Sequence, residues 1–128
     1  MGRVTSIDHC VIAVSQWERS NVFYRDVLGA DLIERGHGFV YVIGEQFLSV
    51  HGPGVAPWYR AQEPVRPGNS DLCFTWSGAI EDAVSHLARY DVPIEAGPLE
   101  AVGPHGRRGR HLYFRDPDGS LLEFVSYE

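Results

Sequence analysis

Residues 6–29, SIDHCVIAVSQWERSNVFYRDVLG, contain the pattern that decides the fold. From Ser6 to Val14 the residues alternate between two faces of a predicted strand, and His9 interrupts one apolar face. Ser15 is followed three residues later by a glutamate, which is the spacing of a capping box. An apolar stripe then continues to Gly29, a typical helix terminator. The stretch therefore predicts a strand followed directly by a helix.

Three short strands are predicted after this helix, at about 31–35, 38–43 and 46–51, with glycines between them. They give the order β-α-β-β-β. Residues 54–68 are rich in Pro and Gly and have no sustained period, so they predict a linker with two exposed aromatic residues, Trp58 and Tyr59.

The same order then begins again. A strand at 71–76 is followed by a helix that Ser77 is expected to cap, and strands are predicted near 92–96, at 109–115 and at 121–127. The last two are joined by a turn at 116–119, to which we assign no chemistry.

Alignment of the two helix starts gives an offset of about 62 residues, which places His9 on Asp71 and indicates an internal repeat. The predicted class is α+β, with tandem βαβββ modules at 5–53 and 69–128 in a single domain, 1–128. The helices are expected on the outside of a curved mixed sheet, an incomplete barrel around a cavity.

Composition excludes several classes of function. The net charge of −6 opposes general binding to nucleic acid, since only Arg107, Arg108 and Arg110 cluster. No apolar run approaches the roughly 20 residues of a membrane helix, and no secretory signal is recognised, so a cytoplasmic location is expected. Cys10 and Cys73 lack a CxxC spacing and are predicted to be buried free thiols.

Glu123 lies within an apolar run, LLEFV, where an unpaired carboxylate would cost several kcal/mol, so it needs a cation or a hydrogen-bond donor. His111 and Tyr113 share a strand face and are predicted to line the cavity, for substrate contact or for proton transfer by His111. Phe39 and Tyr41 are predicted as apolar cavity wall, with a core position as the alternative.

Arg108 and its neighbouring arginines, 107 and 110, are interpreted as a solvated loop or as a clamp for an anionic ligand.

Six motifs spread over nearly the whole chain belong together: Ile7-Asp8-His9, residues 23–29 (FYRDVLG), residues 48–51 (LSVH), residues 69–74 (NSDLCF), residues 113–119 (YFRDPDG) and Leu122-Glu123-Phe124. With these motifs the chain resembles the vicinal oxygen chelate superfamily, which includes glyoxalase I, fosfomycin-resistance proteins, bleomycin-binding proteins and extradiol dioxygenases. The resemblance points to a glyoxalase-like branch.

The resemblance implies metal ligands at the first and last strands of each module, which map to His9, Ser49, Asp71 and Glu123. Ser49 departs from the usual ligand types. His51, two residues further along, would share its face, so the implied set is His9 and Glu123 with Asp71 or His51. An imidazole with carboxylates suits a divalent ion such as Zn, Ni, Mn or Fe(II).

The resemblance further implies a metal-dependent lyase or isomerase that acts on a small oxygenated substrate, with Glu123 or His111 exchanging a proton. The first alternative is a non-catalytic protein that sequesters a small molecule. The second is an Fe(II) dioxygenase, which would use His9, His51 and Glu123. A homodimer is also expected from the resemblance.

Overall fold

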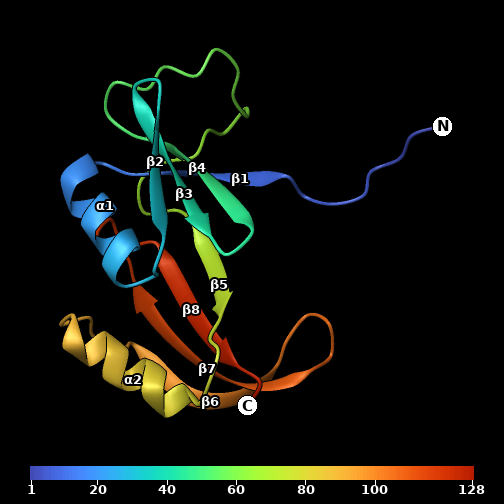
Figure 1. Ribbon diagram of the computed structural model, residues 1–128, viewed down its shortest axis with the longest axis vertical. Helices are drawn as coiled ribbons and strands as arrows, with labels where there is room; N and C mark the ends of the chain where they lie inside the picture. The colour runs from blue at the N-terminus through green and yellow to red at the C-terminus, as the bar shows by residue number, and fades with distance from the viewer. The chain divides into compact units, whose positions relative to one another are not determined.

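The computed structural model describes residues 1–128, which form two units, Met1–Pro67 and Gly68–Glu128. Each unit contains one helix and one four-stranded mixed sheet (Figure 1). Neither sheet closes into a barrel. The predicted α+β class and the tandem βαβββ modules are confirmed.

The N-terminal unit has the strand order β1-β4-β3-β2. Strand β1 runs parallel to β4, and the other two pairings are antiparallel. Its elements are β1 (His9–Ala13), α1 (Trp17–Asp26), β2 (Asp31–Arg35), β3 (Gly38–Ile43) and β4 (Gln46–His51).

Helix α1 covers one face of this sheet through an aromatic contact. Tyr24 of the helix and Tyr41 of β3 are both fully buried, and their rings stack with centroids 4.8 Å apart. The Tyr41 hydroxyl donates to Oδ1 of Asn21 over 2.6 Å, which satisfies the buried phenol. Tyr41 therefore belongs to the core, the alternative that the sequence left open, and not to a cavity wall.

The predicted serine caps are wrong for both helices. Helix α1 has Gln16 as its N-cap residue, with no side-chain cap, and the Ser15 hydroxyl instead accepts a hydrogen bond from Arg19. The second helix, α2 (Ile80–Arg89), has Ala79 at its N-cap, so Ser77 does not cap it. Both helices start later than the capping patterns indicated because packing of their apolar stripes outweighs cap chemistry worth about 1 kcal/mol.

The C-terminal unit repeats the topology, with the strand order β5-β8-β7-β6 and a parallel β5–β8 pair. Helix α2 buries residues at helical spacing, Ile80, Ala83 and Leu87, against the sheet. The strands are β5 (Asp71–Thr75), β6 (Ala96–Val102), β7 (Arg108–Arg115) and β8 (Leu121–Ser126).

Strand β6 lies later in the chain than the predicted strand near 92–96. The backbone N–H of Val92 donates to the Leu87 carbonyl over 2.9 Å, so this residue caps the C-terminal end of α2 and does not pair with a strand. Pro93 has no N–H to give to a ladder. Pairing with β7 runs from Ala96 to Val102, with a register shift between Ala96 and Leu99.

The turn between β7 and β8 is built as predicted. The buried Asp116 carboxylate accepts the backbone N–H groups of Asp118 and Ser120, both over 2.9 Å. Its acidic residues therefore have a structural explanation.

The start of the linker is held by Trp17. Its indole N–H donates to the Pro53 carbonyl over 2.8 Å, and its ring lies against Gly38 and Gly52 so closely that a Cβ at Gly52 would fall 2.6 Å from it. The ring also contacts Phe39, with centroids 5.3 Å apart.

Neither helix has the length and apolar character needed to span a membrane. Both cysteines are free, as predicted, but they are exposed and not buried.

Candidate functional site

The face of the C-terminal sheet that α2 leaves uncovered gathers the titratable side chains of the unit around Glu123. Leu112 and Phe114 of β7 are fully buried on the helix side. Strand alternation therefore turns His111 and Tyr113 to the opposite face. In the register of the sheet, Glu123 on β8 lies between Cys73 on β5 and Tyr113 on β7. Three strands thus contribute to one site.

Glu123 is paired with His111. Nδ1 of the imidazole donates to Oε2 of the carboxylate, and the two side chains are only 6% and 15% exposed, His111 being the deeper. Nε2 of His111 is buried and has no hydrogen-bond partner. A neutral imidazole that donates from Nδ1 has its free acceptor at Nε2. Because that atom is enclosed, Glu123 is the less buried member of the pair, and His111 contacts it from the more buried side.

Cys73 is part of this site, although the sequence analysis assigned it only to the core. The pKa of its thiol is raised from 9.0 to about 12, first by desolvation, then by the negative charge of Glu123, the hydrogen bond to Glu123 and the charge of Asp71. The pKa of Tyr113 is raised by desolvation and by the same two carboxylates. Both groups therefore stay protonated at neutral pH and donate to Glu123. The signal that was available is the two-residue spacing from Asp71, which puts Cys73 on the same strand face.

Asp71 lies two residues along β5 from Cys73, the residue that pairs with Glu123. It pairs with Leu121, while Glu123 pairs with Cys73, so both carboxylates lie on the uncovered face of adjacent strands. The charges of both carboxylates raise the pKa of the Cys73 thiol.

His9 and His51 belong to the N-terminal unit and lie at opposite ends of one strand pairing. His9 pairs with Phe47, and His51 pairs with Ala13. Four residues of strand separate the two pairs, about 13 Å at a rise of about 3.3 Å per residue. The unit does not bring these two predicted ligands together. His9 is half exposed, and its Nδ1 lies 2.9 Å from Oδ2 of Asp8. A carboxylate on one ring nitrogen is the usual support for a histidine that binds metal through the other.

The residue types suit a divalent ion, because two carboxylates and an imidazole are ordinary ligands of such ions. Within either unit, no three His, Cys, Asp or Glu side chains are grouped to hold one ion. Ser49 occupies in the N-terminal unit the position that Glu123 has in the C-terminal unit, since it pairs with Val11 as Glu123 pairs with Cys73. The two modules therefore carry different chemistry at equivalent positions.

Arg108 does not share a face with Glu123. It forms an ion pair with Glu100 of β6 at 3.3 Å, and alternation along β7 places it on the other face from His111. The neighbouring arginines are also engaged, Arg107 over the ring of Tyr127 and Arg110 with Glu81 of α2. Each arginine of the cluster therefore has a partner within this unit, and the anion clamp stays a prediction.

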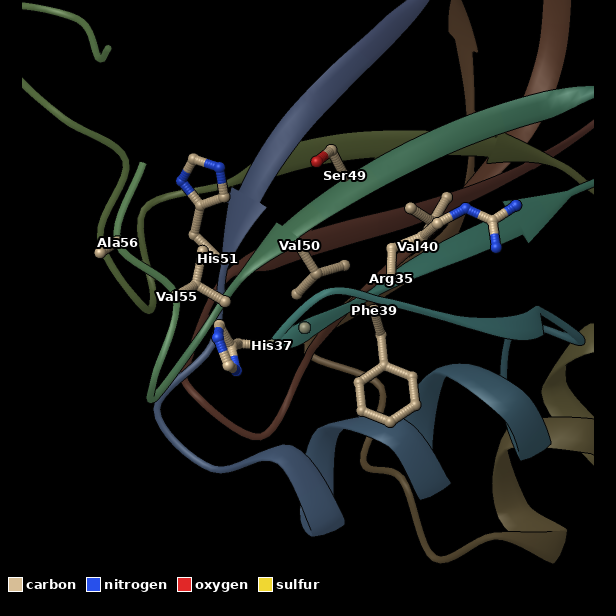
Figure 2. Close-up of a pocket in the computed structure, with 10 residues that line it drawn as sticks. Arg35, His37, Phe39, Val40, Ser49, Val50, His51, Val55 and Ala56 are labelled. Carbon is tan, nitrogen blue, oxygen red and sulfur yellow. The ribbon is translucent and has the colours of Figure 1, made fainter. Parts of the chain in front are cut away.

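Two adjoining hollows lie in the N-terminal unit and share His51 and Val55. The smaller, of about 270 Å³, is lined on one side by Phe39, and Figure 2 shows His51 and His37 on either side of Val55. The larger, of about 460 Å³, lies between β1 and the linker. Phe39 therefore lines a hollow, as predicted for a wall residue, whereas Tyr41 does not.

Comparison with known proteins identifies the family. The model of the Glyoxalase/Bleomycin resistance protein/Dioxygenase superfamily matches residues 6–124. Virulence protein STM3117 of Salmonella typhimurium is 34% identical over 125 residues, which cover 97% of this chain and 85% of that protein. The solved structure of integron cassette protein VCH_CASS1 from V. cholerae superposes with a TM-score of 0.89 at 33% identity, covering 100% of this chain and 99% of the other.

A further relative is the metallothiol transferase FosB of Lysinibacillus sphaericus, 29% identical over 94% of this chain and 82% of that protein. The match to the family model extends over nearly the whole chain and includes both modules. The chain therefore belongs to the Glyoxalase/Bleomycin resistance protein/Dioxygenase superfamily, the vicinal oxygen chelate family that its motifs resemble.

Proposed function

We propose that this protein is a metal-dependent, glyoxalase-like lyase or isomerase that acts on a small oxygenated substrate bound at a divalent metal. The observation that carries the proposal is the Glu123 carboxylate on the uncovered face of the C-terminal sheet, held by His111 from behind. The name of the FosB relative, a metallothiol transferase, supports metal chemistry in this family.

Glu123 retains capacity for a metal beside its three protein donors. An ionised carboxylate offers about four lone-pair sites, and His111, Cys73 and Tyr113 account for three. Of the further ligands that the sequence left open, Asp71 is supported within the C-terminal unit, because it shares a face with Glu123. His9 remains a predicted ligand. When bound, a divalent ion would polarise the substrate oxygens and stabilise negative charge on them.

Side chains of the protein would accept the proton that leaves the substrate and return it. Glu123 can accept a proton from a substrate carbon and return it, because its carboxylate is the less buried member of the pair. His111 fixes the orientation of the carboxylate through Nδ1. Cys73 and Tyr113, whose pKa values are both raised, stay protonated at neutral pH and hold the Glu123 carboxylate through their hydrogen bonds.

The test is metal stoichiometry measured by plasma mass spectrometry, after chelation and return of one ion at a time from Zn, Ni, Mn and Fe(II). We expect about one ion per chain in the unmodified protein and loss of binding in Glu123→Gln. Glu100→Gln is the matched control, since Glu100 is exposed and pairs with Arg108 away from the site. His9→Gln tests the remaining predicted ligand.

Activity is then screened on the metal-loaded protein with α-ketoaldehydes, hemithioacetals and catechols. Turnover of the first two that is lost in Glu123→Gln supports a lyase or isomerase, and turnover of catechols with oxygen supports a dioxygenase instead. If neither the unmodified protein nor Glu100→Gln binds any of these ions, the proposal is overturned.

A sequestering protein is the second candidate, and the larger hollow of the N-terminal unit favours it. A space of about 460 Å³ lies in the range of small-molecule pockets. Tight binding of a small molecule without metal and without turnover would support this candidate over the enzyme.

A further inference from the structure

The two hollows of the N-terminal unit carry an excess of basic groups. The smaller hollow is lined in part by Arg35, His37 and His51, and the larger by His51 and Arg60. No Asp or Glu lines either of them. A pocket lining without acidic residues is unusual in a chain with 17 acidic residues and a net charge of −6. A local positive field inside an acidic protein selects for an anion.

Arg60 is the residue in the lining of the larger hollow that carries a permanent positive charge. Its guanidinium is exposed and forms no hydrogen bond or ion pair, in contrast to Arg66 of the same linker, which pairs with Glu63 at 3.7 Å. An arginine is always charged and presents five donors that match a carboxylate. The imidazole of His51, which lines both hollows, likewise forms no hydrogen bond or ion pair and offers a further ring donor.

The rest of the larger hollow is apolar. Val11 and Ala13 of β1 form the sheet side, and Val55, Pro64 and Val65 of the linker form the opposite side. Pockets that bind small molecules combine such apolar linings with a few polar groups that fix orientation. The lining therefore suits the apolar body of a ligand whose charged end meets Arg60.

We propose that the larger hollow of the N-terminal unit is a binding site for a small carboxylate with an apolar body, with the carboxylate on Arg60 and His51. The inference rests on the second candidate function, for which it names the class of ligand, and it does not depend on the proposed metal site because the hollow binds this ligand without a metal. Arg60 is the group that selects the anion, and Val11, Ala13 and Val65 contact the apolar body.

The test uses phenylacetate as the probe, phenylacetamide as the uncharged analogue of the same shape, and acetate as the analogue without the apolar body. Affinities are measured by calorimetry on chelator-treated protein, and the position of binding by shifts of the amide NMR signals of Val11, Ala13 and Arg60. We expect phenylacetate to bind at least tenfold more tightly than either analogue, because a hydrogen bond to a charged group contributes about a factor of ten or more.

Arg60→Gln is expected to weaken phenylacetate binding about tenfold or more and to leave phenylacetamide binding unchanged. The matched control is Arg66→Gln, which changes a linker arginine that does not line the hollow. Arg60 is exposed and forms no hydrogen bond or ion pair, so we expect its variant to keep the fold, and circular dichroism checks this.

Three results would overturn the proposal: no binding of phenylacetate, equal affinity for phenylacetate and phenylacetamide, or equal losses in the two arginine variants. Metal binding by Glu123 is measured separately, so failure here leaves the proposed metal site standing and the reverse also holds.

Discussion

Cys73 should be an unusually unreactive thiol, although it is exposed. Its pKa is raised from 9.0 to about 12. At pH 8 a shift of this size lowers the thiolate fraction about a thousandfold. A thiolate of higher pKa is intrinsically more nucleophilic, with a Brønsted slope of about 0.4–0.5, which recovers a factor of about 16 to 32. The net expectation is alkylation about 30 to 60 times slower than for an ordinary thiol.

The assay is iodoacetamide labelling of chelator-treated Cys10→Ser protein, followed by intact mass, with the same chain unfolded in urea as the ordinary thiol. Glu123→Gln removes the negative charge, the second cause of the shift, but leaves desolvation and an amide oxygen that still accepts from the thiol, so it should restore the rate in part. Steric protection is separated by the pH profile, because it lowers the rate without moving the midpoint. A native rate that levels off near pH 9 would refute the reasoning.

Two further predictions concern stability. Gly52→Ala should lower the free energy of unfolding by about 1–3 kcal/mol, because its Cβ would overlap the fixed ring of Trp17. Urea unfolding followed by tryptophan fluorescence measures this change, and Gly2→Ala is the control that should have no effect. A change below about 0.5 kcal/mol would show that the ring moves aside. The ion pair with Arg115 holds the pKa of Glu95 below its ordinary 4.5, so its stabilisation is present above that pH and is lost as the pH falls through the lowered pKa. Glu95→Gln should therefore flatten the acid limb of the stability profile below about pH 4.5, and an unchanged profile would argue against the pair.

The sequence predicted the strands most accurately where glycines separate one strand from the next. The strands of the N-terminal unit after α1 were found at the predicted residues, because Gly36 and Gly44 end apolar runs of strand length. The strand near 92–96 was misplaced, because the apolar residues around Pro93 end the helix and do not join the ladder. Local pattern alone does not distinguish these two environments.

The sequence predicted which residues belong to the candidate site better than it predicted how they are arranged. Alternation was enough to place His111 and Tyr113 on one face, and the apolar run around Glu123 was enough to require a partner for it. The partner itself, His111, follows from the register between β7 and β8. The separation of His9 from His51 follows from the parallel register of β1 and β4, which no local pattern encodes.

The hairpin of β7 and β8 also bears on the order of folding. His111 and Glu123 are 12 residues apart in the chain and are joined across one tight turn, whereas Cys73 reaches Glu123 only through the parallel pairing of β5 with β8. Closing a short loop costs less entropy than closing a long one, and hairpins form within microseconds. We therefore expect the hairpin contacts that join the histidine and the carboxylate to form before the long-range pairing that brings the thiol to them.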